Sequence, residues 1–269
     1  MNNIKLLFIY FNIFNYNLYK NDISVKYIPS INYFHFLKLL MNIINHRIDR
    51  CNENRVSSIN NMINNKIYNF EIDINMCNDE LILFHDSQIE DNGNIYDISD
   101  ICYNELNNVD KFDDLIKYLN NISFLDKQIN DLHIYIDIKG TNQEIIKLII
   151  NKLNFKKNTY NGIHFYFQTF NHNFITELQR QNINQFHKIG FITYGYSPYI
   201  PLGIDYLVID KQFIKLYTNY MESLYRTNQI KNLIPLYAYT VNSKDEITNF
   251  LINNDLSGIF TDYPERFIN

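Results

Sequence analysis

The chain has 269 residues, a formal net charge of −5, 46% hydrophobic residues and 16% aromatic residues. This length suits one α/β barrel of roughly 250 residues, and the hydrophobic content can fill a large core. Lysine and arginine are scattered along an acidic chain, which argues against nucleic-acid binding through a broad basic surface. The three cysteines form no CxxC pair, so neither a disulfide framework nor a zinc knuckle is expected.

Residues 1–42 precede the regular pattern and are expected to form an N-terminal extension. The apolar stretch at 4–19 is interrupted by asparagines and is followed by no small-residue cleavage site. It is also shorter than the roughly 20 residues of a membrane span. We therefore expect no transmembrane segment and a cytoplasmic protein, with weak membrane contact left open. Residues 31–42 have the composition of a helix that could pack on the rest of the chain.

From residue 43 onward, short β-branched and aromatic runs alternate with segments of helical spacing. Most runs are apolar on both faces, as buried parallel strands are. The eight runs lie at 42–47, 68–74, 132–139, 162–170, 187–193, 204–210, 234–242 and 257–262. Helical spacing is found at 53–66, 141–153, 172–182, 211–229 and 243–254. Eight such units predict an α/β protein with a single (β/α)₈ TIM barrel over residues 43–269.

An extra short run, LILFHD at 81–86, interrupts the alternation after the second strand. The intervening turn is too short for a helical crossover, so a hairpin is expected there. This insertion should stand beside the end of the barrel where the strands terminate.

Chemically active side chains follow the predicted strands at their carboxyl ends, where barrel enzymes place their active sites. They are His46 and Arg47 on the first strand, Glu71 and Asp73 on the second, His85 and Asp86 on the side strand, and Asp137 and Lys139 on the third. Residues two apart on a strand face the same side. If these faces point inward, three carboxylates, two cations and two histidines meet at one end of the barrel.

This combination of residues is suited to phosphodiester chemistry. The oxygens of Glu71, Asp73 and Asp137 suit Mg²⁺ or Ca²⁺, while Arg47 and Lys139 supply positive charge for a phosphate. Two histidines can serve as acid and base. Buried carboxylates are costly unless they are paired or metal-bound, which favours a metal site.

Structural explanations exist for the same residues. Asp137 and Lys139 could form a simple ion pair, Glu71 and Asp73 could face solvent on an edge strand, and His46 could be a core histidine. The remaining histidines have no partner pattern and are interpreted as structural. They are His35, His133, His164, His172 and His187.

The ordered series of motifs resembles the glycerophosphodiester phosphodiesterase family, over about residues 43–266. That family shows His-Arg-Gly, Glu-Asn-Thr, Glu-x-Asp and then a strand ending in His-Asp. The matching residues are His46-Arg47, Glu53-Asn54, Glu71-Ile72-Asp73 and His85-Asp86, followed by Asp137-Ile138-Lys139, Thr169-Phe170, Tyr239-Thr240-Val241-Asn242 and Gly258-Ile259-Phe260-Thr261-Asp262-Tyr263-Pro264.

The resemblance implies metal-dependent hydrolysis of a glycerophosphodiester to an alcohol and glycerol 3-phosphate. It assigns Glu71, Asp73 and Asp137 to a divalent cation, Mg²⁺ or Ca²⁺. It assigns Arg47 and Lys139 to the substrate phosphate, and His46 and His85 to proton transfer. The substrate would be a small-molecule or lysolipid phosphodiester, and the oligomeric state is left open.

The chain departs from the family pattern at several positions. Ile48 stands where the family has glycine, Arg55 where it has threonine, and Tyr239 where it has tryptophan. Asp137 replaces the usual glutamate and is one methylene shorter, and the segment after His85 lacks the usual arginine and threonine. These differences lie around the expected substrate and affect its choice more than the reaction.

Two rival functions are carried forward. The first resembles the sphingomyelinase D-like phospholipases, which form a cyclic phosphate and whose ligand on the third strand is an aspartate, as Asp137 is. The second is a catalytically inactive barrel that serves as a binding module, for which Ile48 and the altered insertion are the grounds. Product analysis and a thermal shift with metal distinguish these from hydrolysis.

Overall fold

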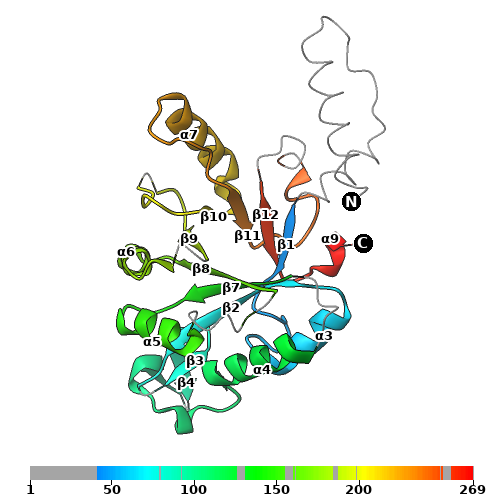
Figure 1. Ribbon diagram of the computed structural model, residues 1–269, viewed down its shortest axis with the longest axis vertical. Coiled ribbons are helices and arrows are strands. Elements are labelled where there is room, and N and C mark those ends of the chain that lie inside the picture. Colours follow the sequence, from blue (N-terminus) through cyan, green and yellow to red (C-terminus); the bar gives the residue numbers. More distant parts are fainter. Residues whose placement is uncertain are drawn as a thin grey trace, which may run out of the picture. The chain divides into compact units, whose positions relative to one another are not determined.

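The computed structural model describes residues 41–268 apart from 79, 92, 126–130, 155–159, 161, 184–186, 198, 249 and 251–255. The parallel strands of a closed barrel are, in chain order, β1 (Asn42–Asn45), β2 (Asn69–Met76), β7 (Leu132–Ile138), β8 (Ile163–Thr169), β9 (Lys188–Thr193), β10 (Tyr206–Asp210), β11 (Leu236–Tyr239) and β12 (Gly258–Thr261) (Figure 1). Strand β1 pairs with both β12 and β2, which closes the ring. All eight predicted strands and the barrel are confirmed.

The helices on the outside of the barrel are amphipathic. They are α3 (Ile59–Asn64), α4 (Phe112–Leu125), α5 (Glu144–Leu153), α6 (His172–Arg180), α7 (Ile214–Arg226) and α9 (Glu265–Ile268), with 3₁₀ turns η1 (Val56–Ser58), η2 (Ile98–Asp100), η3 (Tyr103–Glu105) and η6 (Lys211–Phe213). Helix α5 illustrates the pattern, because Ile145, Ile146, Ile149 and Leu153 are its buried residues. None of the helices among the described residues is long and apolar enough to cross a membrane.

Some predicted helix boundaries differ from the observed ones. The segment predicted at 53–66 becomes helical only at Val56, because Asn54 adopts a left-handed backbone with a φ of 57°. Helix α4 lies in the long insertion before β7 and was not predicted. The segment predicted as helical at 243–254 lies partly outside the described residues.

The domain prediction is only partly within the described residues. The barrel belongs to a compact unit that spans Leu37–Asn269. The predicted N-terminal extension, residues 1–42, and the helix proposed at 31–42 lie outside the described residues except for the last two positions.

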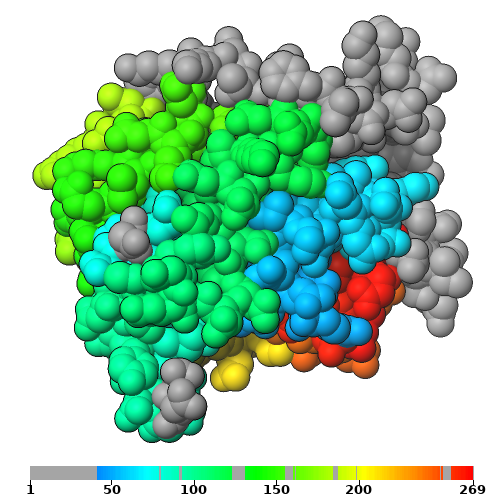
Figure 2. Space-filling view, turned by 90° about the horizontal axis from the view of Figure 1, so that it is seen from below, coloured from blue at the N-terminus to red at the C-terminus, as the bar shows by residue number. Residues whose placement is uncertain are grey.

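The predicted hairpin after the second barrel strand is confirmed. Strand β3 (Leu81–Leu83) runs antiparallel to the end of β2, with Leu83 opposite Ile74, and β6 (Asp110–Lys111) pairs with β3. A second hairpin follows, made of β4 (Gln88–Asp91) and β5 (Asn94–Asp97). This insertion, in teal, lies on the surface beside α4 in Figure 2, and the blue start and red end of the barrel lie side by side there.

The barrel interior contains a cluster of tyrosines. Tyr135, Tyr206 and Tyr237 pack with Phe260, and all four are buried. Glycine occurs where these rings need space, since a Cβ on Gly190 would lie 2.3 Å from the ring of Tyr206. The interior is therefore filled by side chains, and the residues available for chemistry are those at the strand ends.

Candidate active site

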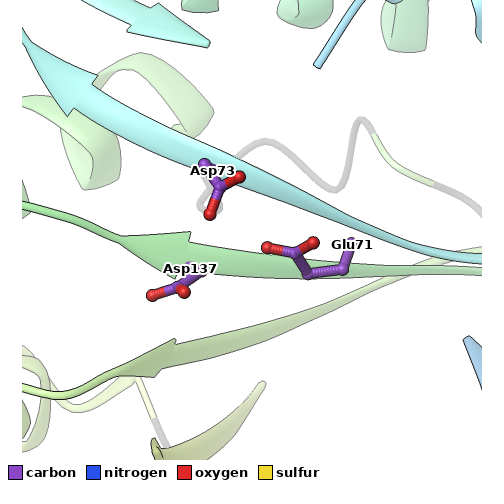
Figure 3. A group of neighbouring side chains, drawn as sticks. All are labelled: Glu71, Asp73 and Asp137. Atoms are coloured by element: carbon purple, nitrogen blue, oxygen red, sulfur yellow. The ribbon is translucent and has the colours of Figure 1, made fainter. Parts of the chain in front are cut away.

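Three buried carboxylates meet at the carboxyl end of the barrel. Glu71 and Asp73 lie two residues apart on β2 and therefore face the same side. Asp73 lies directly opposite Asp137 where β2 pairs with β7. One oxygen of each lies within 4.8 Å of the others, and the side chains converge from adjacent strands (Figure 3). Since none of the three is more than 5% exposed, the edge-strand interpretation of Glu71 and Asp73 is wrong.

The donor set fits a divalent cation. The Oδ1 atom of Asp137 is buried without a hydrogen-bond partner, which is costly for a carboxylate oxygen. Three hard oxygen ligands within reach of one another are what Mg²⁺ and Ca²⁺ require, with water or substrate completing the shell.

The pKa values of the three carboxylates are not shifted in the same direction. Burial raises the pKa of Glu71 well above its usual range, and the charges of Asp73 and Asp137 raise it further. Burial alone would raise the pKa of Asp73 as well, but Lys139 and His85 outweigh it and lower that pKa. Burial, opposed by Lys139 and aided by the charge of Asp73, also raises the pKa of Asp137. Repulsion among the carboxylates therefore affects Glu71 and Asp137, and a cation would relieve it.

Lys139 bridges two of the carboxylates. Its Nζ lies 2.6 Å from Asp137 Oδ2 and 3.0 Å from Asp73 Oδ1. Burial lowers the pKa of Lys139, but Asp137 and Asp73 more than compensate and raise it above its ordinary value. The simple ion pair considered for Asp137 and Lys139 is thus present, and it places a permanent positive charge at the acidic group.

Arg47 contacts the acidic group with its main chain and its side chain. Its backbone N–H donates to Glu71 Oε2 at 2.8 Å, and its Nε lies 3.5 Å from Asp73 Oδ2. The guanidinium is also paired with Glu53 at 2.8 Å. Both Arg47 and Ile48 have positive φ values, 54° and 66°.

Ile48 stands at the position of the family's glycine and shows why glycine is usual there. A β-branched residue with positive φ is rare because its side chain crowds the backbone. The side chain is fully buried, and the Ile48 carbonyl accepts a hydrogen bond from the Asn45 amide. Its bulk is therefore accommodated in the core.

His46 is oriented by an anchored carboxylate. Its Nδ1 lies 2.7 Å from Asp262 Oδ1. Asp262 is held in turn by Asn242, whose Nδ2 donates to Asp262 Oδ2 at 2.8 Å and whose Oδ1 accepts from the Asp262 N–H at 3.0 Å. The hydrogen bond with His46 is the main cause that lowers the pKa of Asp262. With Nδ1 directed at Asp262, Nε2 is the nitrogen available for a substrate.

His85 has a similar but more exposed partner. Its Nδ1 lies 2.6 Å from Asp86 Oδ1, and the Asp86 side chain is 69% exposed, against 29% for Asp262. The charge of His85 helps to lower the pKa of Asp73, which places this histidine near the acidic group. All seven predicted site residues thus lie at the carboxyl end of the barrel.

Sequence reasoning missed two supporting asparagines. Asn54 donates from Nδ2 to Asp73 Oδ2 at 2.9 Å and accepts the Asp73 N–H on Oδ1 at 2.9 Å. Asn242 holds Asp262 in the same reciprocal way. Both belong to quoted motifs, but the abundance of asparagine in this chain concealed their roles.

The similarity of this chain to known proteins extends over most of its length. The profile of the Glycerophosphoryl diester phosphodiesterase family matches residues 45–266. The chain belongs to this family. It is accordingly a phosphoric diester hydrolase of the glycerophosphodiester type. No curated protein matches the chain significantly.

Solved structures share the fold at low sequence identity. A Silicibacter pomeroyi protein assigned as a glycerophosphoryl diester phosphodiesterase is 14% identical with a TM-score of 0.65, covering 85% of this chain and 92% of that one. A Parabacteroides distasonis glycerophosphodiester phosphodiesterase is 19% identical with a TM-score of 0.63, covering 85% and 95%. A calcium-dependent phosphoinositol-specific phospholipase C from Pseudomonas is 10% identical with a TM-score of 0.52, covering 86% and 91%.

Proposed function

We propose that the enzyme hydrolyses a glycerophosphodiester to an alcohol and glycerol 3-phosphate, with a divalent cation and two histidines. The observation that carries this proposal is the buried group of Glu71, Asp73 and Asp137 with an unpartnered carboxylate oxygen. A purely structural ion-pair cluster would not need an oxygen left without a partner.

Glu71, Asp73 and Asp137 would hold the cation, either Mg²⁺ or Ca²⁺. The calcium dependence of the Pseudomonas phospholipase C, which shares the fold, makes Ca²⁺ the first ion to test. When bound, the cation would neutralise charge on the phosphoryl oxygens.

Arg47 and Lys139 would bind the phosphate, because both are positively charged beside the carboxylates. One of His46 and His85 takes a proton from the attacking water while the new P–O bond forms. The other donates a proton to the leaving alkoxide as the old P–O bond breaks, so the protons balance. The Asp262 and Asp86 carboxylates keep each imidazole oriented through Nδ1.

One observation keeps a second reaction open. The aspartate ligand on the third barrel strand, Asp137, is the residue expected for the sphingomyelinase D-like phospholipases. In that reaction a hydroxyl of the substrate replaces water as nucleophile, and the product is a cyclic phosphate.

The test measures products from glycerophosphocholine, glycerophosphoethanolamine and a lysophospholipid with Mg²⁺, Ca²⁺ or EDTA. Metal-dependent release of glycerol 3-phosphate from the first two substrates, or of acylglycerol 3-phosphate from the lysophospholipid, would support the proposal if it is lost in His46→Ala and kept in the matched control His164→Ala. A cyclic phosphate would move the enzyme to the second reaction. No turnover and no metal-induced rise in melting temperature would leave an inactive barrel.

A further inference from the structure

Four exposed aromatic side chains lie just after two of the barrel strands, at the carboxyl end of the barrel. Tyr194 and Tyr199 are 83% and 68% exposed, and Tyr196 and Phe170 are 45% and 42% exposed. Phe170 directly follows β8, and the tyrosines lie on the segment between β9 and β10 (Figure 1). We call these four residues the aromatic rim.

The segment that carries the three tyrosines is anchored to its neighbours. The hydroxyl of buried Tyr217, on α7, accepts from the Ser197 N–H at 2.8 Å and donates to the Gly195 carbonyl at 3.2 Å. The ring of Tyr199 lies 4.9 Å from that of His172 at the start of α6. The backbone at Gly195 and Ser197 is therefore held by α7, and the ring of Tyr199 packs at the start of α6.

Residues 189–204 contain no charged side chain and no histidine. Solvated loops normally carry charges, and exposed apolar surface that adjoins a site commonly marks binding of an apolar group. Tyrosine suits such a boundary because its ring is apolar while its hydroxyl stays in water.

The aromatic rim begins beside Lys139, one of the two residues proposed to bind the phosphate. Lys139 Nζ lies 5.6 Å from the centre of the Phe170 ring, which lies 6.3 Å from that of Tyr239. The Tyr239 hydroxyl donates to the Thr193 carbonyl at 2.8 Å, and Tyr194 is the next residue. A substrate whose phosphate lies at Lys139 would extend along these rings.

We infer that the aromatic rim binds the acyl chain of a single-chain phospholipid, so that the enzyme's substrate is a lysophospholipid. This inference rests on the proposed function, since it places the phosphate at Lys139. Because the aromatic rim begins beside Lys139, we assign it to binding part of the substrate. A second copy of the chain would not need aromatic rings at that position.

The test compares kcat/KM for glycerophosphocholine with that for lysophosphatidylcholines of increasing chain length, all below their critical micelle concentrations. Each added methylene should raise kcat/KM about twofold, the effect of half-burying it. The double variant Tyr194→Ser with Tyr199→Ser should lower kcat/KM for the longest chain about tenfold. Its activity on glycerophosphocholine should stay within about twofold of wild type. The matched control is Tyr225→Ser, an exposed tyrosine near the far end of α7.

A flat dependence on chain length, or equal losses on both substrates, would overturn the inference. A rise only above the micelle threshold would instead assign the aromatic rim to a lipid surface and also overturn it. If no phosphodiester is hydrolysed, the proposed reaction fails separately. In that case, calorimetry measures the binding of monomeric lysolipid to the wild type and to the double variant. Unchanged affinity in the double variant would contradict a role of the aromatic rim in binding the acyl chain.

Discussion

The two ends of the barrel accommodate their polar groups in different ways. At the carboxyl end, Glu71 and its neighbours are buried beside the charged Lys139. At the amino end, the His133 ring stacks on His164 at 4.9 Å and its Nδ1 lies 2.9 Å from the Tyr166 hydroxyl. Burial lowers the pKa of His133, which therefore favours the neutral form. Charge is thus buried at the carboxyl end, whereas the ion pairs of the amino end, such as Lys188 with Asp205, lie nearer the surface, and the end with buried charge is the one suited to catalysis.

The largest expected effect is at the charged end. Asp73→Asn removes a proposed cation ligand and a partner of both Arg47 and Lys139. We expect kcat/KM to fall by at least about 10³-fold, because the cation contributes several kcal/mol. Cation binding measured by calorimetry should be lost as well. Asp131→Asn, at the amino end, is the control and should change neither, whereas retained cation binding in Asp73→Asn would contradict the assignment of this ligand.

The next largest effect separates the two histidine–carboxylate pairs. Asp262→Asn should reduce kcat by about 10²–10³-fold, because it disturbs an anchored partner that fixes the orientation of His46. Asp86→Asn should cost less than about fivefold, since exposed pairs contribute little. The pH profile of kcat for both variants is the measurement, and equal losses would mean that exposure of the carboxylate does not matter.

A smaller effect is expected from the asparagine that holds a proposed ligand. Asn54→Ala frees the carboxylate and the backbone N–H of Asp73. The cation affinity should fall about tenfold or more, as for other residues that orient metal ligands. Asn65→Ala removes an exposed hydrogen bond to the Asn61 carbonyl and should leave the affinity unchanged. A loss of stability in Asn54→Ala without a change in affinity would indicate a purely structural role.

The smallest effect concerns stability at the amino end of the barrel. Burial lowers the pKa of His187 from 6.5 to about 4, with help from His164. The neutral imidazole therefore contributes stability above pH 6.5 that is lost as the pH falls towards 4. Between about pH 7 and 5, the free energy of unfolding should therefore fall more in the wild type than in His187→Phe. The expected difference is about 1 kcal/mol, after allowance for the partial exposure of His187. Denaturant unfolding at both pH values measures this, and parallel losses would contradict it.

The sequence predicted the strands well because most of the runs are β-branched or aromatic and apolar on both faces, as residues 206–209 (YLVI) show. The site residues were predictable because His46, Glu71 and Asp137 belong to residue types that the composition does not favour. The sequence pattern did not predict the structure of the segment between β9 and β10, because the tyrosines and prolines there fit neither a strand nor a helix.

The supporting asparagines were not predictable for a different reason. Asparagine is so frequent in this chain that a single asparagine gives little information about its role. The partners of Asn54 and Asn242 are set by tertiary contacts with Asp73 and Asp262. Likewise, Ile48 was noted as a departure, but only the backbone shows that it adopts the positive φ expected of glycine.

The closure of the barrel has a consequence for the order of events during synthesis. His46 and Asp262 are 216 positions apart, and β1 pairs mainly with β12. Glu71, Asp73 and Asp137 lie within the first two barrel strands after β1 and emerge from the ribosome much earlier. A growing chain therefore contains its proposed cation ligands long before His46 has the carboxylate that orients it. The orientation of His46 by Asp262 therefore has to wait until the last barrel strand has been synthesised and has closed the barrel.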